Sequence, residues 1–458
     1  MLRDQRTEKM PEAPAFRKLL GPSFILLGLG LGSGELVLWP YLTSNFGMGI
    51  IWAAIIGVAM QFFMNMEIER YTLARGESIF VGFARLWRVF PFWFILSTLI
   101  PWIWPGIIAT SAVLFSEIFG TPSDLLAICL LVLIGLILTL GPVLYKTQEF
   151  FQKSILIFGA PFILLLAFLL ARLPDWQVLA SGAFNFGYLP PGIPMASFLA
   201  AIAYAGAGGN LNLAQSFYVK EKGYGMGKYA GRITSLLTGK KEEMDIDIVG
   251  TTFKAEGEEL SRFKKWWRLI NLEHGIIFWF IGTLTIVLLA FLAYMTAFGQ
   301  GGANDISFLI SEATTLGQRT FPFIGKIFLV VAGLMLFSTQ LGVMDTTSRI
   351  LTENLTLTSE RFFPASSIRR NFYIFLWLQI VLGIVVILSG FNQPLVLLTL
   401  AAVLNAAAMF VHIGATLILN LSSLEKPIRP GIFRISMMAV AFAFFGYFLI
   451  KTILGFLA

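Results

Sequence analysis

Two glycine-rich stretches inside hydrophobic segments decide the fold of this chain: G-L-G-L-G-S-G-E at residues 28–35 and A-G-A-G-G-N at residues 205–210. Glu35 ends the first stretch and Asn210 ends the second, so each stretch places a polar residue beside its glycines. Unwound backbone within a membrane persists only where it is buried in protein or lines a polar cavity. Two such breaks in corresponding places of two halves predict a binding site near the middle of the membrane.

The composition is that of a polytopic membrane protein. Of 458 residues, 57% are hydrophobic and 13% are charged, whereas a soluble domain carries roughly 25% charged residues. The chain opens with the charged arm M-L-R-D-Q-R-T-E-K and continues into a segment too long for a signal-peptide core, so we expect no cleavable signal. The single cysteine, Cys129, excludes a disulfide within the chain and a cysteine-based metal site.

Eleven segments meet the requirement of about 20 mostly apolar residues for a spanning helix. They are residues 20–43, 49–66, 91–119, 124–144, 149–171, 196–217, 270–298, 323–347, 371–389, 393–421 and 432–456. Lys and Arg gather in the N-terminal arm and in every second connection. Because basic loops face the cytoplasm, we expect an inner-membrane protein with a cytoplasmic N-terminus and an external C-terminus. The net charge of +7 then reflects topology, and we expect no nucleic-acid partner.

We expect four parts along the chain. They are a cytoplasmic arm at 1–19, a first repeat at 20–171, a second repeat at 196–421 with a cytoplasmic loop at 218–268, and a last span at 432–458. Within the loop, A-E-G-E-E-L-S-R-F-K-K-W-W-R-L predicts an amphipathic helix at the interface, with Trp266 and Trp267 at headgroup depth. The chain lacks the G-x-x-x-x-G-K-[ST] phosphate loop of an ATP-driven pump, and we expect neither a cofactor nor an enzyme activity.

The first ten spans form two five-helix halves of opposite topology, broken in the first and sixth helices. This predicts an all-α membrane protein with a leucine-transporter-type 5+5 inverted repeat and eleven transmembrane helices. Four further stretches resemble the Nramp metal-ion transporters: G-P-S-F at 21–24, E-R-Y-T-L-A-R-G-E-S at 69–78, Y-K-T-Q-E-F-F-Q-K at 145–153 and G-L-M-L-F-S-T-Q at 333–340. The chain resembles a divergent member of that family over nearly its whole length.

The resemblance implies a substrate site at the two breaks, with altered ligands. The family carries D-P-G-N in its first helix and M-P-H in its sixth; the matching residues here are Gly32, Ser33, Gly34 and Glu35, then Ala207, Gly208 and Gly209. The family's metal-binding Asp falls on Gly32 and its Met on Ala207. A carboxylate with carbonyl oxygens and water suits Mg²⁺, Mn²⁺ or Ca²⁺. In this respect the chain is similar to the Nramp-related magnesium transporters, which also lack the Met.

Glu35 and Asn210 are the candidate metal ligands. Capping a half-helix stabilises an acidic residue by about 0.3–1 kcal/mol, while a carboxylate in mid-membrane costs roughly 2.5–3.5 kcal/mol. Capping alone does not offset that cost, which favours Glu35 as a cation ligand or protonation site. Asn210 either offers a carbonyl oxygen to the cation or satisfies the broken helix ends. The same half-helix continues with Asn212 and Gln215, and Thr399 falls where the family's tenth helix offers a Gln.

Other polar residues in the spans have structural explanations. Intramembrane hydroxyls and amides more often bond across helices than bind substrate, which applies to the patch at 338–340, S-T-Q. His274 and His412 have no ligand-spaced partner, and we expect both to be packed or interfacial. Asp345 and Arg349 lie four residues apart and predict an intrahelical pair or an inner gate.

The third span carries no charge between residues 94 and 113. Family members driven by protons carry acidic residues there, and a proton relay needs titratable side chains or a water wire. We therefore expect transport without proton coupling, or with coupling through Glu35 alone. Strict proton co-transport by a Glu35→Gln variant would contradict this expectation.

Three functions fit the sequence. The first is a transporter of a divalent cation, with Mg²⁺ or Mn²⁺ favoured, that works by alternating access. The second is a transporter of a small organic solute such as an amino acid, whose carboxylate suits exposed half-helix N-termini. The third is an Nramp-like membrane sensor or scaffold, for which no large soluble output domain follows the last span.

Overall fold

The computed structural model describes residues 3–16, 19, 21–141, 144–230, 248–299, 305–391 and 393–457. Residues 1–2 and 17–18 of the expected arm and 231–247 of the expected loop lie outside those ranges. Ten helices in the described chain are long and apolar enough to cross a membrane. They are Pro22–Phe46, Met48–Arg75, Phe90–Phe119, Ser123–Leu140, Glu149–Leu170, Gly257–Ala297, Pro322–Thr358, Ala365–Leu388, Pro394–Ser423 and Ile432–Gly455.

These ten helices match ten of the eleven predicted spans. The remaining one, predicted at 196–217, is divided into α10 (Met195–Ala203), the 3-10 turn η4 (Gly209–Ala214) and α11 (Gln215–Lys222). None of these three pieces is long enough to span alone, but together they cover the predicted range.

Several spans consist of more than one helical segment. The first is α1 (Pro22–Gly30), the π-helical η2 (Leu31–Leu38) and α2 (Trp39–Phe46); the second is η3 (Met48–Ile50) and α3 (Trp52–Arg75); the third is α5 (Phe90–Trp102) and α6 (Gly106–Phe119). The seventh is α12 (Gly257–His274), the π-helical η7 (Gly275–Ile281) and α13 (Gly282–Ala297). The third span is interrupted because Pro105 has no N–H to donate to the helix.

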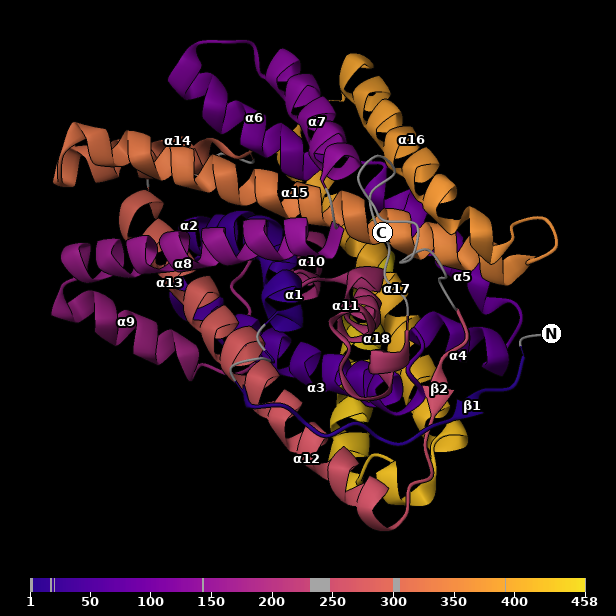
Figure 1. The fold of residues 1–458 in the computed structure, drawn as a ribbon. Coiled ribbons are helices and arrows are strands. Elements are labelled where there is room, and N and C mark those ends of the chain that lie inside the picture. Colours follow the sequence, from indigo (N-terminus) through magenta and orange to yellow (C-terminus); the bar gives the residue numbers. More distant parts are fainter. Residues whose placement is uncertain are drawn as a thin grey trace.

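The other elements complete the bundle. They are α4 (Ile79–Leu86), α7 (Ser123–Leu140), α8 (Leu144–Leu170), α9 (Leu173–Ala183), η5 (Gly225–Tyr229), α14 (Ser307–Arg319), α15 (Pro322–Thr358), η8 (Ala365–Ser367), α16 (Ile368–Leu388), α17 (Pro394–Ser423), η9 (Lys426–Ile428) and α18 (Ile432–Leu457). Figure 1 shows α1 and α10 in the middle of the molecule, with α15 crossing beside them. The most apolar part of the first span is entirely buried, so the two predicted breaks lie in the core.

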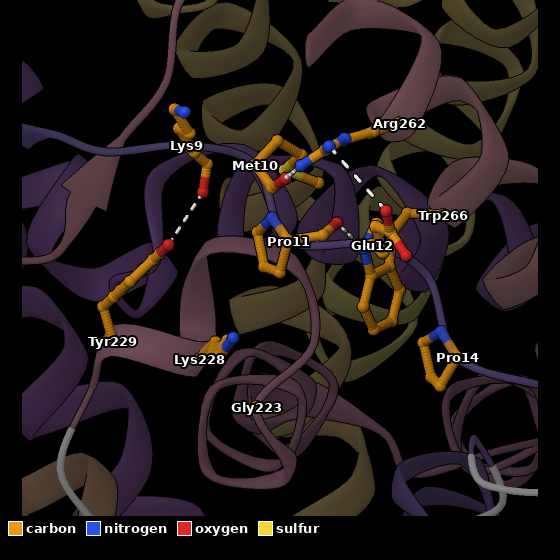
Figure 2. Close-up of a pocket in the computed structure, with 10 residues that line it drawn as sticks. All are labelled: Lys9, Met10, Pro11, Glu12, Pro14, Gly223, Lys228, Tyr229, Arg262 and Trp266. Atoms are coloured by element: carbon orange, nitrogen blue, oxygen red, sulfur yellow. Dashed lines mark hydrogen bonds and ion pairs between the residues drawn. The ribbon is translucent and has the colours of Figure 1, made fainter. Parts of the chain in front are cut away.

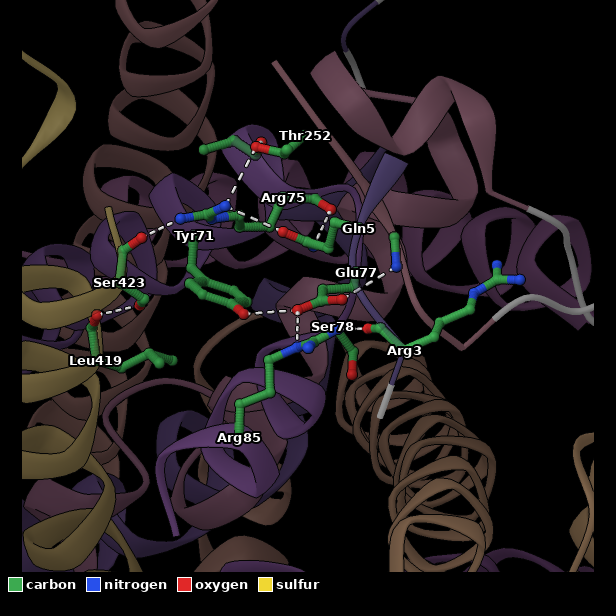
Figure 3. Close-up of polar contacts among 12 residues, drawn as sticks. Arg3, Gln5, Tyr71, Arg75, Glu77, Ser78, Arg85, Thr252, Leu419 and Ser423 are labelled. Carbon is green, nitrogen blue, oxygen red and sulfur yellow. Dashed lines mark hydrogen bonds and ion pairs between the residues drawn. The ribbon is translucent and has the colours of Figure 1, made fainter. Parts of the chain in front are cut away.

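The N-terminal arm lies along one face of the bundle. Its strand β1 (Arg6–Thr7) pairs in parallel with β2 (Thr251–Thr252), as Figure 1 shows. Arg75, at the end of α3, joins the same region, since its guanidinium donates to Gln5 Oε1 at 3.0 Å and Thr252 Oγ1 at 3.3 Å (Figure 3). We refer to this side as the arm face, and we expect it to be cytoplasmic.

Glu77 forms a second anchor on the arm face. Its carboxylate accepts hydrogen bonds from the Tyr71 hydroxyl at 2.7 Å and from the backbone N–H of Gly250 at 3.0 Å, and Arg85 lies 3.3 Å away (Figure 3). Arg85 also donates to the carbonyl of Arg3 at 3.0 Å. Glu77 therefore fastens the end of α3 to the segment that leads into β2.

The predicted helix exists as α12, and its Trp266 is enclosed by protein. Trp266 is buried, donates its indole N–H to the carbonyl of Pro11 at 2.8 Å and packs against Tyr224. The guanidinium of Arg70 lies over the Trp267 ring, with its Cζ atom 3.9 Å from the ring centroid. The N-terminal arm covers this face of α12, so Trp266 packs against protein, and its predicted headgroup depth stays a prediction. Between arm and helix is a pocket of about 550 Å³ (Figure 2).

Candidate functional site

The first predicted break is a widened helix rather than an unwound one. In an α-helix the N–H of Gly32 would bond to the carbonyl of Gly28. Here the hydroxyl of Thr339, on α15, lies between them: it donates to the Gly28 carbonyl at 2.8 Å and accepts from the Gly32 N–H at 3.0 Å. A side chain inserted into the helical ladder is a known cause of local distortion, and π-helical turns are frequent at functional sites.

The second predicted break is confirmed. The backbone leaves the helix after Ala203, and Gly208 and Gly209 have φ values of 75° and 57°. Glycine adopts this left-handed region without the steric cost that other residues incur. The glycines of A-G-A-G-G-N therefore permit the turn that separates α10 from α11.

Side chains of two other helices satisfy the freed carbonyls at the second break. Gln61 of α3 donates to the carbonyl of Ala203 at 3.0 Å and lies 3.4 Å from that of Ile202. His412 Nε2, on α17, lies 3.0 Å from the Gly209 carbonyl oxygen. These contacts supply what a membrane-buried break requires, because lipid offers no hydrogen bonds.

The two breaks touch each other through their backbones. A Cβ atom at Gly34 would lie 1.6 Å from the carbonyl oxygen of Tyr204, and one at Gly30 would lie 2.5 Å from that of Gly206. A Cβ atom at Gly32 would lie 2.6 Å from the Thr339 hydroxyl oxygen. The glycines of the first stretch are therefore required for close contact with the second break and with α15.

Glu35 is fully buried and only partly satisfied. The hydroxyl of Thr285, on α13, donates to its Oε2, while Oε1 has no hydrogen-bond partner within the described chain. The same hydroxyl lies 3.1 Å from the carbonyl oxygens of Ile281 and Gly282. One hydroxyl proton serves one acceptor at a time, so Glu35 shares the Thr285 hydroxyl with these carbonyls. Because Oε1 has no partner within the described chain, Glu35 has a carboxylate oxygen available for another ligand.

Asn210 faces a different neighbour from Glu35. Its amide nitrogen donates to Ser97 Oγ at 2.8 Å and Thr98 Oγ1 at 2.9 Å, both on α5, and its Oδ1 has no partner in the described part of the chain. Glu35 contacts α13 instead. Within the described residues, no hydrogen bond joins the two candidate metal ligands, and each is held by a different helix.

The remaining predicted site residues divide into two groups. Ser33 and Ala207 are buried with the glycines at the breaks. Thr399 is only half-buried, and the hydrogen bonds from α17 to the second break come from Asn405, to the Tyr204 hydroxyl at 2.8 Å, and from His412. Within the described ranges, no three His, Cys, Asp or Glu side chains are grouped so as to hold a metal ion.

Sequence analysis missed a second polar cluster toward the arm face. Gln215 donates its amide to Glu69 Oε1, which lies 3.6 Å from His274 Nδ1. Ser23 Oγ lies 2.8 Å from the same nitrogen and donates to Glu273. All five side chains are buried. In the sequence, His274 was expected to be packed or interfacial, and its neighbour Glu273 was the one signal that could have pointed to this cluster.

A buried ionic network joins α11 to α15 nearer the arm face. Arg349 donates to Asp345 at 2.9 and 3.0 Å and also binds Glu221 of α11. The Tyr218 and Thr346 hydroxyl oxygens lie 2.5 Å apart across the same contact. The predicted Asp345–Arg349 pair is confirmed, and through Glu221 it fastens the second half of the sixth span.

Comparison with solved structures identifies the fold. A point mutant of the Eremococcus coleocola manganese transporter matches 99% of this chain and 91% of its own length, with a TM-score of 0.72 and 14% sequence identity. The chain shares its fold with that manganese transporter. The same transporter in complex with an aromatic bis-isothiourea substituted compound matches 98% of this chain and 89% of its own, at a TM-score of 0.70 and 14% identity.

A more distant match has a different ligand. MhsT in complex with L-phenylalanine matches 99% of each chain, with a TM-score of 0.52 and 14% identity. No protein-family model and no curated protein sequence matches the chain. At such identities the similarity shows the leucine-transporter-type fold, whereas function depends on the site.

Proposed function

We propose that this chain is a secondary transporter, a divergent relative of the Nramp family, that moves a divalent metal cation by alternating access. We favour Mg²⁺ or Mn²⁺ as the substrate. The observation that carries the proposal is the close packing of the two breaks at Gly30 and Gly34, next in sequence to the buried Glu35. Backbone meets backbone at Gly30 and Gly34 with no room for a methyl group, so a site formed by a small separation of these segments would fit an ion.

The available ligands are hard oxygen donors. Glu35 contributes one carboxylate oxygen without a partner, and Asn210 contributes an unpartnered amide oxygen. Carboxylate, carbonyl and water oxygens suit Mg²⁺ and Mn²⁺, and Mg²⁺ usually keeps several of its waters. Because Glu35 and Asn210 face different helices here, we propose that rocking of the first and sixth spans brings both to the ion.

The proposed topology follows the predicted charge distribution. The arm face would be cytoplasmic in the inner membrane, with the C-terminus outside. The Arg349 network fastens α11 to α15 near that face, which supports assigning this conformation to the stage of the cycle that is closed to the cytoplasm.

A small organic solute is the second candidate. It is favoured by the fold shared with MhsT, which was solved in complex with L-phenylalanine. An amino acid would have to displace the contacts of Gly34 with Tyr204 and of Gly30 with Gly206, whereas a cation needs less space. A sensor or scaffold function has no supporting contact in the described residues.

The test is uptake by purified protein in liposomes, with Mg²⁺, Mn²⁺ and Ca²⁺ followed by an internal indicator. Wild type is compared with Glu35→Gln, which keeps the shape of the side chain, and with Glu117→Gln, which alters an exposed carboxylate on α6. We expect flux of one divalent ion in the wild type and the control, and loss of flux in Glu35→Gln. Absence of flux for all three ions in folded wild-type protein would refute the cation proposal and favour the organic solute.

A further inference from the structure

The polar cluster around His274 contains two carboxylates that the proposed cation site does not use. Glu69 comes from α3 and Glu273 from α12, and both are fully buried. Glu69 Oε1 lies 3.6 Å from His274 Nδ1, and Glu273 reaches the same nitrogen through Ser23 Oγ, which lies 2.8 Å from it. Two acidic groups therefore converge on one imidazole nitrogen inside the protein.

Burial makes full ionisation of this pair expensive. Like charges that share a dehydrated site cannot both remain ionised, so one of them retains a proton. Glu69 Oε2, Glu273 Oε1 and His274 Nε2 have no hydrogen-bond partner among the described residues. The His274 ring is stacked on Phe278 with 4.7 Å between ring centroids and on Phe62 with 5.7 Å. The apolar rings leave the imidazole with the carboxylates and Ser23 as its polar neighbours.

Two asparagines share helix faces with members of the cluster. Asn65 lies one helical turn before Glu69 on α3, and Asn212 lies one 3-10 turn before Gln215, which donates to Glu69. All four of their polar atoms are buried and have no hydrogen-bond partner in the part of the chain that the structure describes. Unpaired buried amides are costly and indicate a position that a further polar group or water occupies during function.

We propose that Glu69 and Glu273, with His274 between them, form a proton-binding site. The proton moves between a carboxylate oxygen and the imidazole or water, and no other bond is made or broken. This site is separate from Glu35 and differs from our sequence-based expectation of transport without proton coupling, or with coupling through Glu35 alone. Its role in transport rests on the proposed function, but proton binding itself does not.

The position of Glu273 connects protonation to the first span. Its carboxylate lies at the start of α1, where it accepts from Ser23 Oγ and faces the backbone N–H groups of Gly21 and Ser23. The start of a helix favours a negative charge. A proton on Glu273 therefore weakens its hold on the first half of the broken first span, while an ionised Glu273 strengthens it.

The other charges near the site are few. The positive charge of Lys222, on α11, attracts the carboxylate of Glu273 electrostatically. Lys222 also forms an ion pair with Glu149 of α8 at 3.1 Å. Arg70, next to Glu69 on α3, instead pairs with Glu67 at 2.8 Å. Arg434 of α18 also lies 3.4 Å from Glu67. Glu69, Glu273 and His274 are thus the groups that determine whether the site holds a proton.

The first experiment measures proton binding directly. The infrared band of protonated, buried carboxyl groups is recorded in full-length protein in lipid as the pH is changed. We expect a band that titrates in the wild type and in the Glu117→Gln control, and that is lost or shifted in both Glu69→Gln and Glu273→Gln. His274→Phe, which keeps the aromatic stack, should shift the pH at which the band titrates. A wild type without the band, or unchanged titration in both Gln variants, overturns the proposal.

The second experiment tests coupling in liposomes. Uptake of the transported divalent ion is compared with and without an imposed pH gradient. We expect Glu69→Gln and Glu273→Gln to lose the gradient-dependent part of uptake and to retain ion exchange without a gradient. Gradient-dependent uptake that persists in both variants overturns the coupling. If no ion is transported, the proposed function fails while the infrared result still decides the proton site. If a Gln variant does not fold, His274→Phe decides the proton site, because other buried carboxyls such as Glu312 also contribute to the wild-type band; unchanged titration in His274→Phe then overturns the proposal.

Discussion

The hydroxyl of Thr339 should hold the first span in its widened form, and replacing it should cost measurable stability. Thr339→Val keeps the size and branching of the side chain but removes the group that bonds both Gly28 and Gly32. A buried carbonyl and a buried N–H would then lose their partner, at about 1–3 kcal/mol each. Rewinding to an α-helix would pair them with each other. However, Gly30 and Gly34 are pressed against the carbonyls of Gly206 and Tyr204, which opposes rewinding.

We therefore expect Thr339→Val to lower the free energy of unfolding by about 2–6 kcal/mol. The matched control is Thr339→Ser, which keeps the hydroxyl and removes only a methyl group, and it should remain within about 1.5 kcal/mol of the wild type. The assay is equilibrium unfolding in mixed detergent micelles, with helix content as the signal. A loss below about 0.5 kcal/mol for Thr339→Val, or equal losses for both variants, would refute the inserted-hydroxyl explanation.

Three further predictions concern single side chains. Gly34→Ala should reduce the yield of folded protein because its Cβ would meet the Tyr204 carbonyl oxygen, whereas Gly431→Ala meets nothing within 4 Å; equal size-exclusion profiles would contradict this. Arg349→Ala should lower the free energy of unfolding by about 3–5 kcal/mol, because Asp345 and Glu221 stay buried without their cation. Adding Asp345→Asn should recover part of this loss. No recovery in the double variant would count against a charge effect. Burial raises the pKa of Glu312, on α14, well above its ordinary value of 4.5. The folded state then binds a proton that the unfolded state releases, so stability should fall as the pH rises from about 4.5 toward the raised pKa. Glu312→Gln should remove this fall when the melting temperature is measured against pH. The same pH dependence in the variant and the wild type would contradict the prediction.

Hydropathy alone predicted most of the fold. Ten predicted spans match membrane-length helices, because about 20 apolar residues have few stable alternatives to a spanning helix. The second break was also predictable, since the turn at Gly208 and Gly209 uses backbone angles that glycine provides locally.

The first break was not predictable in detail because its shape depends on a side chain from another span. Thr339 lies some three hundred positions away in sequence. The stretch G-L-G-L-G-S-G-E alone does not indicate that a distant hydroxyl bonds its backbone. We did predict that the hydroxyls at 338–340 bond across helices, and Thr339 confirms this. The cluster of Glu69 and Glu273 escaped prediction for the same reason, since each residue alone resembles an ordinary charged helix end.

The seventh span extends beyond a single bilayer crossing. Gly257–Ala297 forms one helix of 41 residues, which at about 1.5 Å per residue is roughly 60 Å long, about twice the thickness of the hydrocarbon core. Along this one rod lie Trp266 against the N-terminal arm, His274 in the proton site and Thr285 on Glu35. A tilt imposed at one end of a continuous helix moves the contacts along it, apart from what the π-helical turn η7 absorbs. The contact of the N-terminal arm with Trp266 is in this way connected through one helix to the buried carboxylate of Glu35.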